Sequence, residues 1–140
     1  MTINEAQDEI IEEFEELDEW FDRYQLIIEY GKELKKHPMP EQDKTPQNLI
    51  DGCQSSVWFT ANYENGILSF KGDSDAILVK GMVALILQVI NNHTPKEILD
   101  SELYFIDKIG LREHLSPTRS NGLAAMIKQI KLYALAYQSK

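Results

Sequence analysis

The sequence predicts one mixed α/β (α+β) domain, with a small antiparallel sheet of about three strands packed against several helices. Apolar residues recur every three or four positions in the N-terminal third and again after residue 74, which is helical spacing. Between these regions, residues 48–72 are rich in branched and aromatic side chains, which favour strands. With 140 residues, 43% of them hydrophobic, the chain has room for a single domain over residues 1–140.

The first element is expected to be an acidic helical segment over residues 5–33. Asp18 is expected to cap a second helix at a break within it, and Gly31 suits its end. Its apolar face is formed by Ile10, Phe14, Leu17, Phe21, Tyr24 and Ile28. The acidic residues between them could suggest a carboxylate metal site, but no histidine falls within the run. We therefore interpret these acidic residues as a solvated helix face.

A proline-rich linker and the sheet follow. The linker is expected to be extended over residues 35–47, because proline fixes φ and cannot donate a backbone hydrogen bond. The sheet is expected over residues 48–72, with strands in "NLID", "SVWFTANYE" and "ILSFKG". Asn65 and Gly66 form the preferred pair for a tight hairpin turn between the last two strands. Cys53 falls in the connection between the first two.

The remaining residues, 74–138, are expected to be helical. A long, mostly apolar helix comes first, and Ser74 and Asp75 at its start can cap exposed amides. Thr94 is followed three residues later by Glu97, a capping-box pattern that predicts a short helix. A Ser-Pro pair then opens a terminal helix.

The charge balance and the absence of known motifs exclude several function classes. With 23 acidic against 14 basic residues, the net charge of −9 argues against a nucleic-acid partner, because such proteins gather basic residues into a patch. The chain has neither a long apolar run nor the start of a secretory signal, so we expect a cytoplasmic protein without membrane association. The glycines form no phosphate-binding loop, and the three histidines lack the spacing of a zinc motif.

Cys53 is the single cysteine of the chain, which excludes an internal disulfide and every metal site built from several cysteines. A free cysteine is usually a small buried hydrophobe, and composition alone favours that reading. Its context "DGCQSS", however, is a polar segment between two expected strands, where reactive groups are often placed on a rigid scaffold. No histidine or aspartate is visibly paired with this thiol, so a cysteine hydrolase fits poorly, whereas a sulfur acceptor needs less.

Four separated stretches, in this order, resemble the SufE family of sulfur acceptors from about residue 14 to residue 136. The first holds Trp20, Tyr24, Ile28 and Gly31. The others are Gly52-Cys53-Gln54-Ser55 with Val57-Trp58, Gly72-Asp73-Ser74-Asp75-Ala76 with Lys80-Gly81, and Leu115-Ser116-Pro117-Thr118-Arg119-Ser120-Asn121-Gly122-Leu123. The resemblance implies a fold like that of SufE and the cluster scaffold IscU.

The resemblance also implies a function. Cys53 would take a sulfane sulfur from the persulfide of a PLP-dependent cysteine desulfurase of the SufS type and pass it to the SufBCD scaffold for iron–sulfur cluster assembly. The chain would be a sulfur carrier that stimulates its desulfurase, not an enzyme, with no cofactor or metal of its own. A second nearby thiol would attack such a persulfide and release its sulfur, which makes a single cysteine suitable for a carrier.

Several alternatives stay open at this stage. The chain could be a CsdE-like acceptor for another desulfurase pathway, or a stand-alone thiol redox protein. Gly52, Gln54, Ser55, Asp75 and Arg119 are hypothesised to support the cysteine loop or contact the partner. A helix cap for Asp75 and a structural ion pair for Arg119 are interpretations at least as good as these functional roles. The exposure of the thiol and the presence of a homodimer are not predicted by the sequence.

Overall fold

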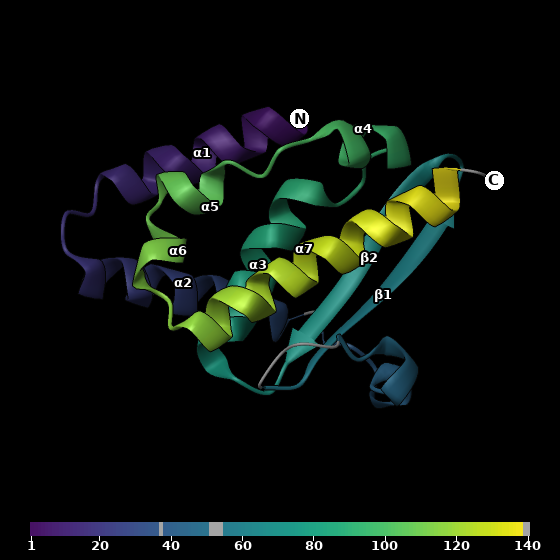
Figure 1. The fold of residues 1–140 in the computed structure, drawn as a ribbon, viewed down its shortest axis with the longest axis horizontal. Helices are drawn as coiled ribbons and strands as arrows, with labels where there is room; N and C mark the ends of the chain where they lie inside the picture. The colour runs from purple at the N-terminus through teal and green to yellow at the C-terminus, as the bar shows by residue number, and fades with distance from the viewer. Residues whose placement is uncertain (37, 51–54, 139–140) are drawn as a thin grey trace.

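Two helices at the N-terminus lead through a linker into a β-hairpin, and further helices follow it (Figure 1). The computed structural model describes residues 1–36, 38–50 and 55–138. Its elements are α1 (Ile3–Glu15), α2 (Trp20–Leu34), the 3-10 turns η1 (Glu41–Asp43) and η2 (Pro46–Asn48), β1 (Val57–Glu64), β2 (Ile67–Ser74), α3 (Ile77–Ile90), α4 (Pro95–Asp100), α5 (Phe105–Lys108), α6 (Leu111–His114) and α7 (Pro117–Gln138). The predicted α+β class is confirmed.

The N-terminal helices differ from the prediction at their starts. Thr2 and Glu5 form a capping box, so α1 begins two residues before the expected segment. Glu19, and not Asp18, occupies the N-cap position of α2, and its side chain makes no capping hydrogen bond. The prediction for Asp18 was therefore wrong.

The two strands form an antiparallel hairpin whose register runs from Val57 opposite Ser74 to Glu64 opposite Ile67. Asn65 and Gly66 have φ angles of 54° and 81°, as the two central residues of a type I′ turn require, and this prediction is confirmed.

The expected third strand is reduced to a single bridge in the part of the chain that the structure describes. Leu49 pairs with Trp58, and the Ile50 amide donates to the Val57 carbonyl oxygen at 2.8 Å. The turn η2 continues to Asn48, so that only Leu49 and Ile50 are extended in the described part of this segment. The described sheet therefore has two strands, one fewer than expected.

The outer side of β2 is covered by the residues that follow α3. The Asn91 side chain accepts a hydrogen bond from the Phe70 amide (2.6 Å) and donates to the Phe70 carbonyl oxygen (3.1 Å). Next to it, the Leu68 amide donates to the His93 carbonyl oxygen at 2.8 Å. A side-chain amide and a short main-chain segment thus occupy the place of a neighbouring strand.

Helix α3 is the centre of the core and is buried on most of its surface, as predicted. It packs against β2 on one side and crosses α2 on the other (Figure 1). The crossing is close because Gly81 stands opposite Ile27, where a Cβ would overlap the main chain of α2. The predicted capping box of Thr94 and Glu97 is present at the start of α4. Within the described ranges, no helix is long and apolar enough to span a bilayer.

Candidate functional site

Of the residues predicted for the site, Gly52, Cys53 and Gln54 lie outside the described residues. Ser55, Asp75 and Arg119 are described, although they belong to three different parts of the chain. Ser55 and Arg119 line the same cavity, and Asp75 stands beside Ala76, which lines it too. The fold therefore brings the three predicted motifs together around one cavity.

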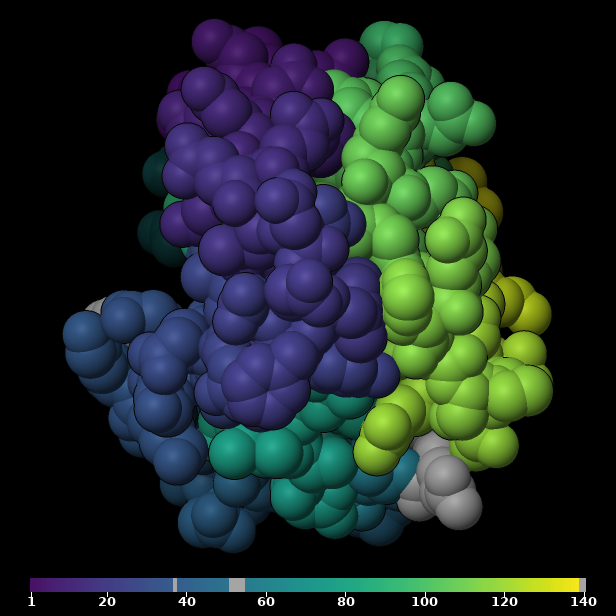
Figure 2. All heavy atoms as spheres, turned by 90° about the vertical axis from the view of Figure 1, so that its left-hand side faces the viewer, coloured from purple at the N-terminus to yellow at the C-terminus, as the bar shows by residue number. Residues whose placement is uncertain are grey.

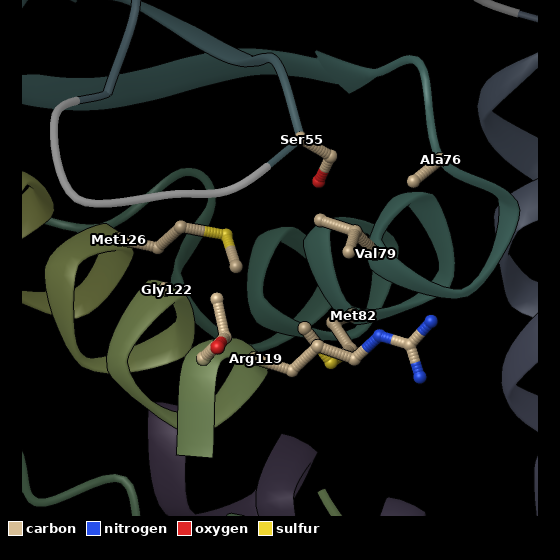
Figure 3. Close-up of a pocket in the computed structure, with 8 residues that line it drawn as sticks. Ser55, Ala76, Val79, Met82, Arg119, Gly122 and Met126 are labelled. Carbon is tan, nitrogen blue, oxygen red and sulfur yellow. The ribbon is translucent and has the colours of Figure 1, made fainter. Parts of the chain in front are cut away.

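The cavity has a volume of about 200 Å³ and lies between the start of α3, the start of α7 and Ser55 (Figure 3). Its lining residues are Ser55, Ala76, Val79, Met82, Thr118, Arg119, Gly122 and Met126. Figure 3 shows Met126 projecting from α7 toward α3, while the Arg119 guanidinium extends along the side of α3 away from Met126. The cavity thus combines an apolar interior with a polar rim that carries one permanent positive charge.

Asp75 holds the main chain of Ser56, the residue after Ser55. Its carboxylate accepts a hydrogen bond from the Ser56 amide at 3.1 Å, and its own amide donates to the Ser56 carbonyl oxygen at 3.2 Å. The Ser74 hydroxyl donates to the same carbonyl oxygen at 2.8 Å. These bonds fix the chain at the point where β1 begins.

The interpretation of Asp75 as a helix cap is wrong. Helix α3 begins at Ile77, its N-cap is Ala76, and no side chain makes a capping hydrogen bond there. The cause is that Ser56 bonds to Ser74 and Asp75, which continues the pairing of the two strands beyond Val57 and Ser74. The Asp75 carboxylate therefore accepts from the Ser56 amide and not from the amides at the start of α3.

The buried carboxylate of Asp73 anchors the end of β2 next to Ser74 and Asp75. Its oxygens lie 3.0 Å from the Lys80 ammonium and 3.3 Å from that of Lys44, and they accept a hydrogen bond from the Ser74 amide at 2.8 Å. Burial opposes ionisation of Asp73, but these positive and donor groups outweigh it and lower the pKa of its carboxyl group below the ordinary value. Lys44 also lies over the ring of Trp58, so the linker is attached to the sheet at this point.

Arg119 has an exposed side chain, and the described residues supply no ion-pair partner for its guanidinium. Its main-chain amide donates to the Ser116 hydroxyl at 3.3 Å, which helps to start α7. The interpretation of Arg119 as half of a structural ion pair therefore has no support among the described residues. Among the residues that the structure describes, no carboxylate neutralises this positive charge at the cavity rim.

The sequence did not identify the interior of the cavity. Val79, Met82 and Met126 are apolar residues on two predicted helices, and their spacing indicates only that they are buried. That they line a shared cavity depends on how α3 and α7 approach each other. Among the residues that the structure describes, no group of three or more potential metal-binding side chains is gathered in one place.

Comparison with known proteins places this arrangement in a family. The family model described as "SufE: Fe-S metabolism associated domain" matches residues 8–134. The chain belongs to the SufE family. A SufE-like protein of Rhizobium meliloti is 45% identical over 129 residues, which cover 89% of this chain and 91% of the relative. A SufE-like protein of Synechocystis is 41% identical over 129 residues, covering 92% of this chain and 80% of the relative.

One solved structure has the same fold as this SufE-family chain. It is the solution structure of a hypothetical protein from Thermus thermophilus, with a TM-score of 0.76 and 21% sequence identity. The similarity covers 96% of this chain and 97% of that one. At this identity the likeness concerns the fold, which agrees with the SufE assignment made from sequence.

Proposed function

We propose that this SufE-family chain is a cytoplasmic, single-domain sulfur carrier and that Cys53 is the residue that accepts the sulfur. The observation that supports this most strongly is the cavity at Ser55, which three family motifs surround. Cys53 precedes Ser55 by two residues in the sequence, and two peptide units span at most about 7 Å. The covalent chain alone therefore keeps the Cys53 Cα within that distance of the Ser55 Cα.

The proposed reaction is a thiol–persulfide exchange. The Cys53 thiolate attacks the terminal sulfur of the persulfide on a PLP-dependent cysteine desulfurase of the SufS type. A new S–S bond forms on Cys53 as the S–S bond of the desulfurase breaks, and the desulfurase cysteine leaves as a thiolate. The number of sulfane sulfurs is unchanged, so no external oxidant or reductant is needed. The SufBCD scaffold then takes the sulfur from the Cys53 persulfide in the same way.

The surrounding residues have distinct proposed roles. The guanidinium of Arg119 favours the thiolate and persulfide anions of Cys53, because a nearby positive charge lowers the pKa of a thiol. Asp75 holds Ser56, and thereby fixes the end of the segment that carries Gly52, Cys53 and Gln54. The apolar side chains of Val79, Met82 and Met126 would shield the Cys53 persulfide from attack by thiols in solution.

A mass measurement tests the proposal. The reduced chain is incubated with its desulfurase, PLP and cysteine, and its intact mass is measured before and after reductant. We expect a reductant-labile gain of about 32 Da for each sulfur transferred, confined to the peptide with Cys53. The Cys53→Ser variant should gain no mass and should not stimulate desulfurase turnover.

Other results would contradict the proposal in defined ways. Stimulation by Cys53→Ser equal to that by the parent would mean that sulfur acceptance is not the mechanism. A gain of about 16 Da with peroxide, without any gain from the desulfurase, would instead indicate a thiol redox protein. Sulfur transfer with another cysteine desulfurase, and none with a SufS-type one, would indicate the CsdE-like pathway.

A further inference from the structure

The start of α2 is clamped onto the segment that leads into α7. Trp20 and Tyr24 stand one helical turn apart on α2, and both contact His114. The Trp20 ring stacks on the imidazole with 3.9 Å between ring centroids and an interplanar angle of 16°. The Tyr24 hydroxyl donates a hydrogen bond to the His114 carbonyl oxygen at 3.1 Å. Figure 2 shows α2 and the α6–α7 segment lying directly side by side.

His114 is connected to the cavity through a few residues. Helix α7 begins at Pro117, three residues after His114, and Leu115 between them is buried. The first turns of α7 contribute Thr118, Arg119 and Gly122 to the cavity wall. Because only two residues separate His114 from the start of α7, a restraint on His114 also restrains the first turn of this wall.

The start of α2, which carries Trp20 and Tyr24, is itself held in place by Arg23. The Arg23 guanidinium donates to the Leu17 carbonyl oxygen at 2.8 Å and to the Ile109 carbonyl oxygen at 2.8 Å. This ties the first turn of α2 both to the connection that follows α1 and to the end of α5. Trp20 and Tyr24 therefore extend from an anchored helix end to the more exposed His114.

Trp20 interacts with its neighbours through the aromatic ring and not through a hydrogen bond from its indole nitrogen. Its indole nitrogen is buried, and no hydrogen-bond partner for it exists among the described residues. An unpaired buried donor costs stability, so a hydrogen bond does not explain an indole at this position. The contacts that remain are ring contacts, the stack on His114 and an edge contact with Tyr24 at 5.0 Å between centroids.

We propose that Trp20 and Tyr24 are positioning residues, which act through His114 to hold the α7 wall of the cavity and its Arg119 in place. The inference rests on the proposed function, because the purpose of the wall is to serve sulfur transfer at that cavity. Trp20 and Tyr24 are not among the residues that line the cavity. Their effect should therefore appear in the rate of transfer and in the protection of the first turns of α7.

Two pairs of variants test the clamp. Tyr24→Phe removes only the hydroxyl that binds His114, and Tyr104→Phe is its control, since that hydroxyl binds the Asn4 carbonyl oxygen (3.3 Å) and Asp8 (2.7 Å) on α1. Trp20→Leu removes the stacked ring, whereas Trp20→Phe keeps an aromatic ring and loses the unpaired nitrogen. The measurements are amide hydrogen exchange in α7, maximal desulfurase stimulation and the half-saturating carrier concentration.

We expect Tyr24→Phe and Trp20→Leu to speed exchange at residues 119–123 and to lower maximal stimulation. A roughly fivefold fall in maximal stimulation corresponds to the loss of one hydrogen bond. The half-saturating concentration should change by less than about twofold, because a mispositioned wall affects transfer more than docking. Tyr104→Phe and Trp20→Phe should match the parent in all three measurements.

Unchanged exchange at residues 119–123 in both Tyr24→Phe and Trp20→Leu would overturn the clamp. Equal losses of stimulation in Tyr24→Phe and Tyr104→Phe would also overturn it, since the effect would then be general destabilisation. Failure of the proposed function is recognised separately, by a parent chain that gains no sulfur and stimulates no desulfurase. In that case, faster exchange in the two variants would still establish the mechanical link between α2 and α7.

Discussion

Gly81 of α3 lies so close to α2 that an added Cβ would stand 2.1 Å from the Ile27 carbonyl oxygen. The obstacle is main chain, which cannot rotate away as a side chain can. We expect Gly81→Ala to force the two helices apart and to lower the free energy of unfolding by about 3 kcal/mol or more. Urea denaturation measures this change.

Gly66 in the hairpin turn provides the control for that measurement. It has a φ of 81° but nothing within 4 Å of an added Cβ, so Gly66→Ala meets only backbone strain, about 1 kcal/mol. If Gly81→Ala costs no more than Gly66→Ala, the helix crossing is less tightly packed than we describe.

The pairing of Asp73 with Lys80 and Lys44 should make stability depend on pH in acid. Because the folded-state pKa of Asp73 lies below its ordinary value of 3.8, its stabilising contribution is complete above that value and is lost as the pH falls through the folded-state pKa. Asp73→Asn should therefore lower the free energy of unfolding at neutral pH by about 1 to 3 kcal/mol. The difference from the parent should shrink below about pH 4.

Urea denaturation between neutral and acid pH tests this, with Asp107→Asn as the control. Asp107 pairs with Arg112 at the surface, where ion pairs contribute about 1 kcal/mol or less. A difference between parent and Asp73→Asn that stays constant with pH would contradict the prediction.

The hydrogen bond from the Ser56 amide to Asp75 should restrict the reactivity of Cys53. Asp75→Ala removes a charged acceptor, and we expect Cys53 to be alkylated by iodoacetamide roughly three to ten times faster, as expected for about 1 kcal/mol of lost restraint. Asp100→Ala removes the same charge from α4, and should leave the rate unchanged. A rate in Asp75→Ala equal to that of the parent would mean that Ser56 does not control access to the thiol.

The guanidinium of Arg119 should stabilise the Cys53 thiolate. Arg119→Ala is expected to raise the pKa of the Cys53 thiol, because it removes a positive charge that favours the thiolate, whereas Arg119→Lys keeps the charge and most of the effect. Ultraviolet absorbance of the thiolate as a function of pH measures this directly. Equal thiol pKa values in the parent and both variants would show that the arginine acts on the partner and not on the sulfur.

Features set by a few neighbouring residues were predictable from the sequence. The hairpin turn at Asn65-Gly66 and the capping box at Thr94 depend on local backbone preferences, and both are confirmed. The capping box of Thr2 and Glu5 has the same signature and could have been found by the same rule. The family motifs also indicated which distant stretches meet, since Ser55 and Arg119 line one cavity.

Features that depend on tertiary contacts were not predictable. Asp75 is a residue type that often caps helices, and it stands just before α3. Its carboxylate accepts a hydrogen bond from the Ser56 amide instead, which no local sequence rule indicates. The stack of Trp20 on His114 joins residues that are far apart in the chain. The third strand was expected from the composition of "NLID", yet a two-residue bridge at Leu49 and Ile50 is all that the described residues contain.

The hydrogen bonds of Asn91 along β2 have a consequence for the behaviour of the protein at high concentration. A strand with free amides and carbonyls along its edge can pair with the same strand of another molecule, which is a common route to aggregation. Here the Asn91 amide and the His93 main chain occupy the bonding positions of Phe70 and Leu68. Asn91 thus helps to protect the β2 edge of the hairpin against intermolecular strand pairing, without the entropy cost of ordering a full third strand.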